Sequence, residues 1–137
     1  MEFGTIWHMN TIFTKIINRE IPAQFVYEDD VCVVIMDKFP VVTGQVLIIP
    51  KVEVDYFFNL DDTTSQHLFD MMKKITKALD TTYRTLRTCV VIEGFEVPHA
   101  HIKLYPLTTH GFNMHGGKEA DEATLAKEAE NIRANLS

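Results

Sequence analysis

A long helical repeat over residues 61–79 separates two groups of short apolar runs, and this arrangement restricts the folds open to the chain. Within the repeat, Leu68, Ile75 and Leu79 recur on one helical face, and two aspartates stand at its start. The apolar runs on both sides are rich in valine and isoleucine and are too short for typical helices, so they predict strands. A helix between two groups of strands indicates an α+β domain.

The other periodicities complete a predicted order of helix, three strands, helix, two strands and helix. The predicted helices cover residues 11–20, 61–79 and 120–136, and the predicted strands cover residues 24–28, 31–37, 45–49, 88–92 and 99–105. We expect the strands to form one mainly antiparallel five-stranded sheet with the helices packed on it. The hairpin signals are weak, so the sequence leaves the order of the strands open.

The bulk composition restricts the class of partner. A chain of 137 residues is expected to be one domain, over residues 9–137, with residues 1–8 as an N-terminal extension or a cloning remnant. A net charge of −6 argues against binding a nucleic-acid polymer, and no run is apolar for long enough to span a membrane. Cys32 and Cys89 lie in apolar runs without metal or redox spacing, which predicts buried free thiols in a cytoplasmic protein.

The predicted last strand carries the residues that could perform chemistry. Alternation along HAHIK places His99, His101 and Lys103 on one face, with Ala100 and Ile102 on the other. Two imidazoles and an ammonium suit the charge of a phosphoryl group, and an imidazole is a competent nucleophile near neutral pH. Two other interpretations stay open at this point: a solvated strand face without a site, and a metal site built on the His-x-His pair.

Two stretches of the chain resemble the histidine triad (HIT) family. The run GFEVPHAHIKLYP, residues 94–106, is similar to the family's active-site strand, whose pattern is His-φ-His-φ-His-φ-φ with φ apolar. Residues 11–51, with TIFTKIINREIPA, VYEDD, VCVVIMD and GQVLIIPK, resemble the nucleoside phosphoramidase branch. Both stretches keep the family's order and spacing, so the resemblance implies a HIT-like fold and a symmetric homodimer.

The resemblance also implies an activity: a hydrolase or transferase acting at the α-phosphorus of purine nucleoside phosphates or phosphoramidates, with no cofactor. His101 matches the nucleophile that becomes nucleotidylated, and His99 matches the outer histidine that keeps this ring in order. Asp37, at the end of the second predicted strand, matches the acceptor for the ribose hydroxyls. The other expected nucleotide-binding residues come from an apolar slot for the base and from the loop before the histidines: Ile12, Phe13, Ile16, Ile35, Leu47, Gly94, Glu96 and Val97.

Two departures from the family pattern affect the expected chemistry. Lys103 replaces the third histidine, and its ammonium can neutralise phosphate charge but is a poor proton relay near neutral pH. Glu96 replaces a serine that commonly donates to the phosphate, so its carboxylate either turns away or favours an unusual substrate. These changes support a rival hypothesis, a nucleotide-binding protein with little or no catalysis that acts as a sensor or interaction module.

A metal-binding module is the third hypothesis, and the ligand positions argue against it. Zinc-binding relatives supply a Cys-x-x-Cys pair, a later histidine and the first triad histidine. The matching positions here are Thr11, Thr14, Glu53 and His99, and threonines are not zinc ligands in such sites, so no metal is expected.

Three further histidines lie outside the motif. His67 is expected on the polar side of the long helix, in contact with solvent. His110 and His115 lie in a glycine-containing segment, for which a place at the border of the pocket is the weaker of two interpretations.

Overall fold

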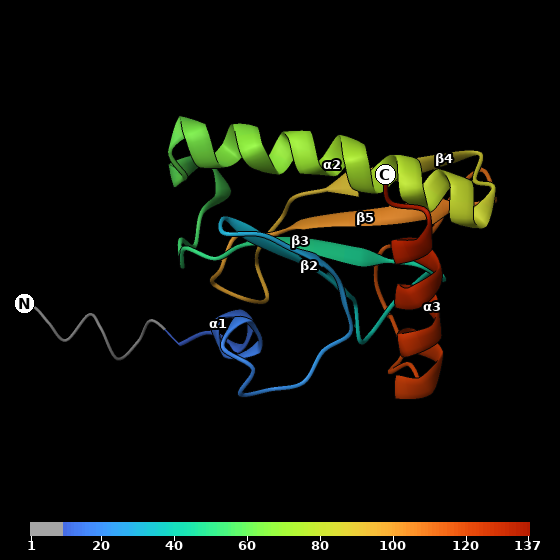
Figure 1. The fold of residues 1–137 in the computed structure, drawn as a ribbon, viewed down its shortest axis with the longest axis horizontal. Helices are drawn as coiled ribbons and strands as arrows, with labels where there is room; N and C mark the ends of the chain where they lie inside the picture. The colour runs from blue at the N-terminus through green and yellow to red at the C-terminus, as the bar shows by residue number, and fades with distance from the viewer. Residues whose placement is uncertain (1–9) are drawn as a thin grey trace, which may run out of the picture.

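The computed structural model describes residues 10–137, and the predicted extension, residues 1–8, lies outside them. The helices and strands follow the predicted order (Figure 1): α1 (Ile12–Ile17), β1 (Phe25–Glu28), β2 (Cys32–Met36), β3 (Val46–Pro50), the short 3-10 helix η2 (Phe57–Asn59), α2 (Asp62–Tyr83), β4 (Arg87–Val91), β5 (Ile102–Leu107) and α3 (Glu122–Ala134). The sequence did not predict η2. None of the helices in this described part of the chain has the length and apolar composition that a bilayer span requires.

The five strands pair antiparallel in one sheet, in the order β1-β2-β3-β5-β4. β2 and β3 are buried along their whole length, as expected for central strands whose two faces are both covered. β1 and β4 form the edges of the sheet. The structure confirms the predicted α+β fold and supplies the strand order that the sequence left open.

Alternation along the central strands divides the core into two layers. In β2, Val34 packs in the core beneath α2 and α3, whereas Ile35 packs in the smaller core beneath α1. In β3, Ile48 and Leu47 divide in the same way. Figure 1 shows α2 along one side of the sheet, α1 on the other and α3 at one end of the strands, where its Leu125, Ala129 and Ile132 pack into the same core as α2. Because α1 is short, it covers only part of its face, and this leaves room for a cavity beside it.

The last strand begins at Ile102 rather than at His99, so its predicted start was wrong. The preceding backbone makes other bonds: the His99 amide donates to Val97 O at 2.8 Å, and the Ala100 amide donates to Val54 O at 2.7 Å. These bonds hold the segment in a bend before the ladder with β3 starts. The predicted alternation of faces still holds here, because Ala100 packs in the core beneath α2, whereas the His99 ring contacts Phe13 of the core beneath α1.

Candidate active site

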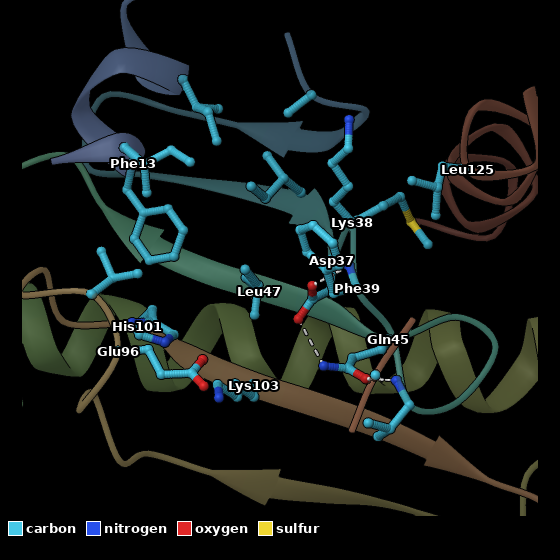
Figure 2. Close-up of a pocket in the computed structure, with 18 of the residues that line it drawn as sticks. Phe13, Asp37, Lys38, Phe39, Gln45, Leu47, Glu96, His101, Lys103 and Leu125 are labelled. Carbon is cyan, nitrogen blue, oxygen red and sulfur yellow. Dashed lines mark hydrogen bonds between the residues drawn. The ribbon is translucent and has the colours of Figure 1, made fainter. Parts of the chain in front are cut away.

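A cavity of about 680 Å³ lies between α1, the central strands and residues 114–117 (Figure 2). Most of the predicted site residues line it, although they are far apart in the sequence: Ile12, Phe13, Ile16, Ile35, Asp37, Leu47, Glu96, Val97, His101 and Lys103. Its volume is typical of pockets that bind small molecules, and a largely apolar wall with a few polar groups is typical of them too. The structure therefore places the predicted nucleophile and the predicted apolar slot for the base in the same cavity.

Two predicted site residues do not line this cavity. His99 is completely buried, and its ring meets Phe13 edge-on at 5.7 Å between centroids. Gly94, at a left-handed φ of 70° that favours glycine, lines a smaller neighbouring cavity together with Phe95. His99 can thus influence a ligand only through its neighbours, and the structure does not bring Gly94 to the main cavity.

The contacts of His101 define the state of its ring. Its Nδ1 lies 2.8 Å from the carbonyl oxygen of His99, which can only accept, so Nδ1 carries the hydrogen and Nε2 keeps its lone pair. Burial lowers the pKa of His101, and the positive charge of Lys103 acts in the same direction, while the bond to the His99 carbonyl opposes both. Phe13 packs edge-on against this ring at 4.9 Å. A neutral, well-held imidazole with a free Nε2 is suited to nucleophilic attack.

Asp37 directly follows β2, and two donors hold its carboxylate. The Phe39 amide donates to Oδ1 and the Gln45 side-chain amide donates to Oδ2, both at 2.8 Å. Gln45 is itself buried, and its carbonyl oxygen accepts from the Val41 amide at 2.7 Å (Figure 2). Each Asp37 oxygen retains an unused lone pair, so the carboxylate can accept from two neighbouring hydroxyls without losing its supports.

Lys103 does not present an isolated positive charge. Its Nζ donates to Glu93 Oε1 at 2.9 Å, and Figure 2 shows Glu96 beside it in the cavity. Burial alone would lower the pKa of Lys103, but the bond to Glu93 and the neighbouring negative charges outweigh it, so this pKa lies above its ordinary value. Of the two possibilities raised for Glu96, the first does not hold, because the residue lines the cavity rather than turning away from it.

Sequence reasoning missed part of the cavity wall. It did not identify Gln45 or Glu93, and it favoured a place outside the pocket for His115, which lines the cavity. Two adjacent glycines were the available signal for this part of the wall. A Cβ at Gly117 would lie 2.0 Å from the backbone oxygen of Phe39, so only glycine allows this close approach.

The prediction that His67 is simply solvated was wrong. Its Nε2 lies 2.7 Å from Asp29 Oδ2, and Cys32 lies close enough to complete a group of three possible metal ligands. However, Asp29 Oδ1 already accepts from the Val31 and Cys32 amides at 2.8 Å, and Oδ2 also accepts from the Tyr27 hydroxyl at 2.9 Å. Burial and the charge of Asp29 raise the pKa of Cys32 to about 12, which keeps the thiol protonated. These contacts form a hydrogen-bonded junction between the β1–β2 turn and α2.

The positions that supply zinc ligands in some relatives also form a hydrogen-bonded group here. Thr14 Oγ1 donates to Glu53 Oε1, and Thr11 Oγ1 lies 2.8 Å from His99 Nδ1. Two threonine hydroxyls replace the two thiolates, and the ring nitrogen of His99 already has a partner. This donor set does not fit a structural zinc ion.

Comparison with known families matches residues 18–110 to the HIT domain. The chain belongs to the HIT family. An uncharacterized HIT-like protein of Borreliella burgdorferi is 33% identical over 116 residues, which cover 79% of this chain and 84% of the relative. The purine nucleoside phosphoramidase of Escherichia coli K12 is 32% identical over 103 residues, which cover 69% of this chain and 84% of the enzyme. The resemblance drawn from the two sequence stretches is confirmed.

Solved structures give the same family. The crystal structure of a HIT-like protein from Bartonella henselae superposes on this HIT protein with a TM-score of 0.85 at 29% identity. The match covers 93% of this chain and 96% of the Bartonella chain. At this level the protein is a member of a family of nucleotide-binding hydrolases and transferases.

Proposed function

We propose that this HIT protein is a hydrolase or transferase acting at the α-phosphorus of purine nucleoside phosphates or phosphoramidates through a nucleotidyl intermediate on His101. The observation that carries the proposal is the state of the His101 ring, which lines the cavity and has its Nδ1 occupied by the His99 carbonyl at 2.8 Å. The name of the Escherichia coli relative, a purine nucleoside phosphoramidase, supports a purine nucleotide joined to an amine as the first substrate to test.

The proposed reaction consists of two displacements at phosphorus. In the first, the Nε2 lone pair of His101 forms a bond to the α-phosphorus while the bond to the leaving group breaks and its electron pair departs with that group. An amine or alkoxide leaving group takes up a proton from solvent as it departs. In the second, the oxygen of water or of another acceptor bonds to phosphorus and gives up its proton to solvent, while the bond to His101 Nε2 breaks and its electron pair returns to Nε2.

The cavity offers a separate place for each part of a nucleotide. Asp37 is proposed to accept from the ribose hydroxyls, because its carboxylate is fixed by two donors and keeps free lone pairs. Phe13, Ile35 and Leu47 line the apolar part of the cavity, which we propose for the base. The phosphate would then lie beside His101, at the end of the cavity where Figure 2 shows Glu96 and Lys103 next to this ring.

We also propose a symmetric dimer formed through the β4 edge. β4 is an edge strand in this sheet, Val90 on it is 43% exposed, and Leu86 just before it is 58% exposed. Unpaired backbone groups beside exposed apolar side chains form a template for pairing with a second copy of the chain. Light scattering should give the mass of a dimer for the wild type and of a monomer for Val90→Lys, and a monomeric wild type would refute the proposal.

We also propose a cytoplasmic location, with which the two free cysteines are compatible.

A nucleotide-binding protein with little or no catalysis is the second candidate function. The pairing of Lys103 with Glu93 and the presence of Glu96 favour it, because both reduce the positive charge that faces a phosphate. Such a protein could still bind a nucleoside through Asp37 and the apolar wall.

A single-turnover experiment separates the two candidates. Protein in excess is mixed with an AMP or GMP phosphoramidate, quenched in denaturant without acid, and weighed by mass spectrometry. The proposal expects one nucleotidyl group per chain, located on His101 by peptide mapping. Wild-type protein that binds the nucleotide but acquires no such group with any leaving group of a panel would be a binding protein.

A further inference from the structure

A chain of hydrogen bonds leads from Glu53 to the ring of His99. Thr14 Oγ1 donates to Glu53 Oε1 at 2.5 Å, and the Thr11 amide donates to the same oxygen at 3.1 Å. Thr11 Oγ1 lies 2.8 Å from His99 Nδ1, and the other ring nitrogen, Nε2, lies 2.8 Å from the backbone oxygen of Pro50. Both nitrogens of this buried ring are therefore held.

The direction of each bond in this chain follows from the groups involved. The Pro50 carbonyl can only accept, so His99 Nε2 carries a hydrogen, and in a neutral ring Nδ1 must then accept. The Thr11 hydroxyl is the donor to it, and the same oxygen accepts from the Thr14 amide at 3.2 Å as the N-cap of α1. Burial lowers the pKa of His99 and favours the neutral ring, although the bond to Pro50 and the charge of Glu53 act in the opposite direction.

The same network reaches the nucleophile through the backbone of His99. The His99 carbonyl accepts the hydrogen of His101 Nδ1, and this bond leaves Nε2 of His101 free to react. The hydrogen bonds at both ring nitrogens of His99 restrain this residue, and its carbonyl makes the bond to His101. In addition, the first turn of α1, which Glu53 anchors, carries Phe13, whose ring packs on both imidazoles.

We propose that Thr11 and Glu53 are positioning residues for His101 and act on it through His99. The inference rests on the proposed function, because it concerns the same nucleophile. Without the Thr11 hydroxyl, His99 Nδ1 would face the Thr14 hydroxyl, which lies 3.5 Å away and already donates to Glu53. The ring could then turn or adopt the other tautomer, which cannot donate to Pro50. The carbonyl that orients His101 would lose its restraint.

Thr11 variants and a matched helix-cap control provide the kinetic test. Thr11→Val removes the hydroxyl at nearly constant volume, Thr11→Ser keeps it, and Glu53→Ala removes the anchor but leaves Thr11 in place. Asp61→Ala is the control, because Asp61 caps α2 by accepting from the Thr64 amide at 2.7 Å and bonds to neither histidine. Its loss should lower the melting temperature without changing the rate.

Thr11→Val is expected to slow nucleotidylation of His101 about tenfold, the effect of one lost buried hydrogen bond, with little change in the dissociation constant for AMP. Thr11→Ser should restore the rate, and Glu53→Ala should show a smaller loss in the same direction. Wild-type rates in both Thr11→Val and Glu53→Ala would overturn the proposal. A loss of nucleotide affinity without a loss of rate would also overturn it, because it would show a binding role instead.

Imidazole nitrogen NMR tests the same proposal without a substrate. In the wild type, His99 should be protonated at Nε2 and His101 at Nδ1. In Thr11→Val, the two nitrogen signals of His99 should move toward each other as both tautomers become populated, and Thr11→Ser should restore them. Unchanged signals in Thr11→Val would refute the linkage. If the wild type forms no nucleotidyl-His101, the proposed function fails, whereas a tautomer change in Thr11→Val would still support the role of the network.

Discussion

Lys103 and Glu93 form an ion pair inside the cavity, with Lys103 Nζ 2.9 Å from Glu93 Oε1. Lys103 occupies the position at which the family pattern has its third histidine. The bond lowers the pKa of Glu93 and helps to raise that of Lys103, so both groups are charged near neutral pH. In the proposed reaction, a phosphate beside His101 would therefore share the ammonium with a carboxylate, and a departing amine would meet a group that holds its proton tightly.

His101→Ala should abolish turnover while nucleotide binding stays nearly intact. The substitution removes the Nε2 nucleophile but leaves Asp37 and the apolar wall in place. Turnover of an AMP phosphoramidate and the AMP-induced rise in melting temperature should be measured on the same preparation. Most of the activity surviving in the alanine variant would rule out the covalent mechanism.

Asp37→Ala should weaken binding of ribonucleotides by about 1.5–3 kcal/mol, the cost of removing a charged acceptor. Deoxyribonucleotides should lose less, because they present fewer hydroxyls to this carboxylate. Calorimetry with AMP and its deoxy analogue measures both values. Equal affinities of the wild type for the two nucleotides would show that Asp37 has another role.

The sequence predicted the face on which His99 and His101 lie. It did not predict the contacts that hold their rings. The alternation of side chains depends on the extended backbone alone, so the predicted faces are correct although β5 starts later than predicted. The partner of Lys103 is Glu93, on the loop after β4, and no local pattern records such a contact between strand ends. His115 reaches the cavity because Gly117 passes close to Phe39, which depends on the path of the whole segment after β5.

Threonines at positions 11 and 14 illustrate the same limit. The resemblance showed only that these two positions lack the metal ligands of some relatives. It predicted no other role for the threonines. Their bonds to His99 and Glu53 became visible only when α1 was placed against the end of β3. Apolar residues were easier to predict, since Phe13, Ile35 and Leu47 follow from periodicity together with the family pattern.

The rate of His101 nucleotidylation should fall at low pH along an acid limb centred below about 6.5, the ordinary pKa of histidine. In the proposed mechanism the reactive ring is the unprotonated form, and burial lowers the pKa of His101, so half-protonation should occur only below that value. A nucleotide with fluoride as leaving group is the right substrate, because its departure needs no proton. An acid limb centred above about 6.5 would contradict the neutral, buried nucleophile.

Asp29→Asn should lower the free energy of unfolding by about 2 kcal/mol at neutral pH, since it weakens several bonds to a charged acceptor. Despite burial, the amides of Cys32 and Val31 and the side chains of His67 and Tyr27 hold the pKa of Asp29 well below its ordinary value. A depressed carboxyl pKa stabilises the fold above the unfolded value of about 3.9, and this stability is lost as the pH falls below it.

Denaturant titrations between about pH 5 and about pH 2 measure this pH dependence. The difference in stability between the wild type and Asp29→Asn should shrink as the pH falls. Asp30→Asn is the control at the neighbouring exposed aspartate and should track the wild type. A difference between the wild type and Asp29→Asn that is independent of pH would mean that the charge of Asp29 contributes nothing.

Lys103→His should raise the rate on substrates with basic leaving groups, by about tenfold or more, and should change the rate on a nucleoside fluorophosphate much less. An amine must be protonated as it departs, and an imidazole beside Glu93 is a better proton donor near neutral pH than a lysine whose pKa is raised. Fluoride needs charge stabilisation only, which Lys103 already supplies.

The measurement for Lys103→His is the ratio of kcat/KM for the two substrates. Lys38→His, at another cavity lysine, is the control and should leave this ratio unchanged. If Lys103→His leaves the ratio unchanged as well, Lys103 does not contact the leaving group, and its ammonium serves to hold the phosphate instead.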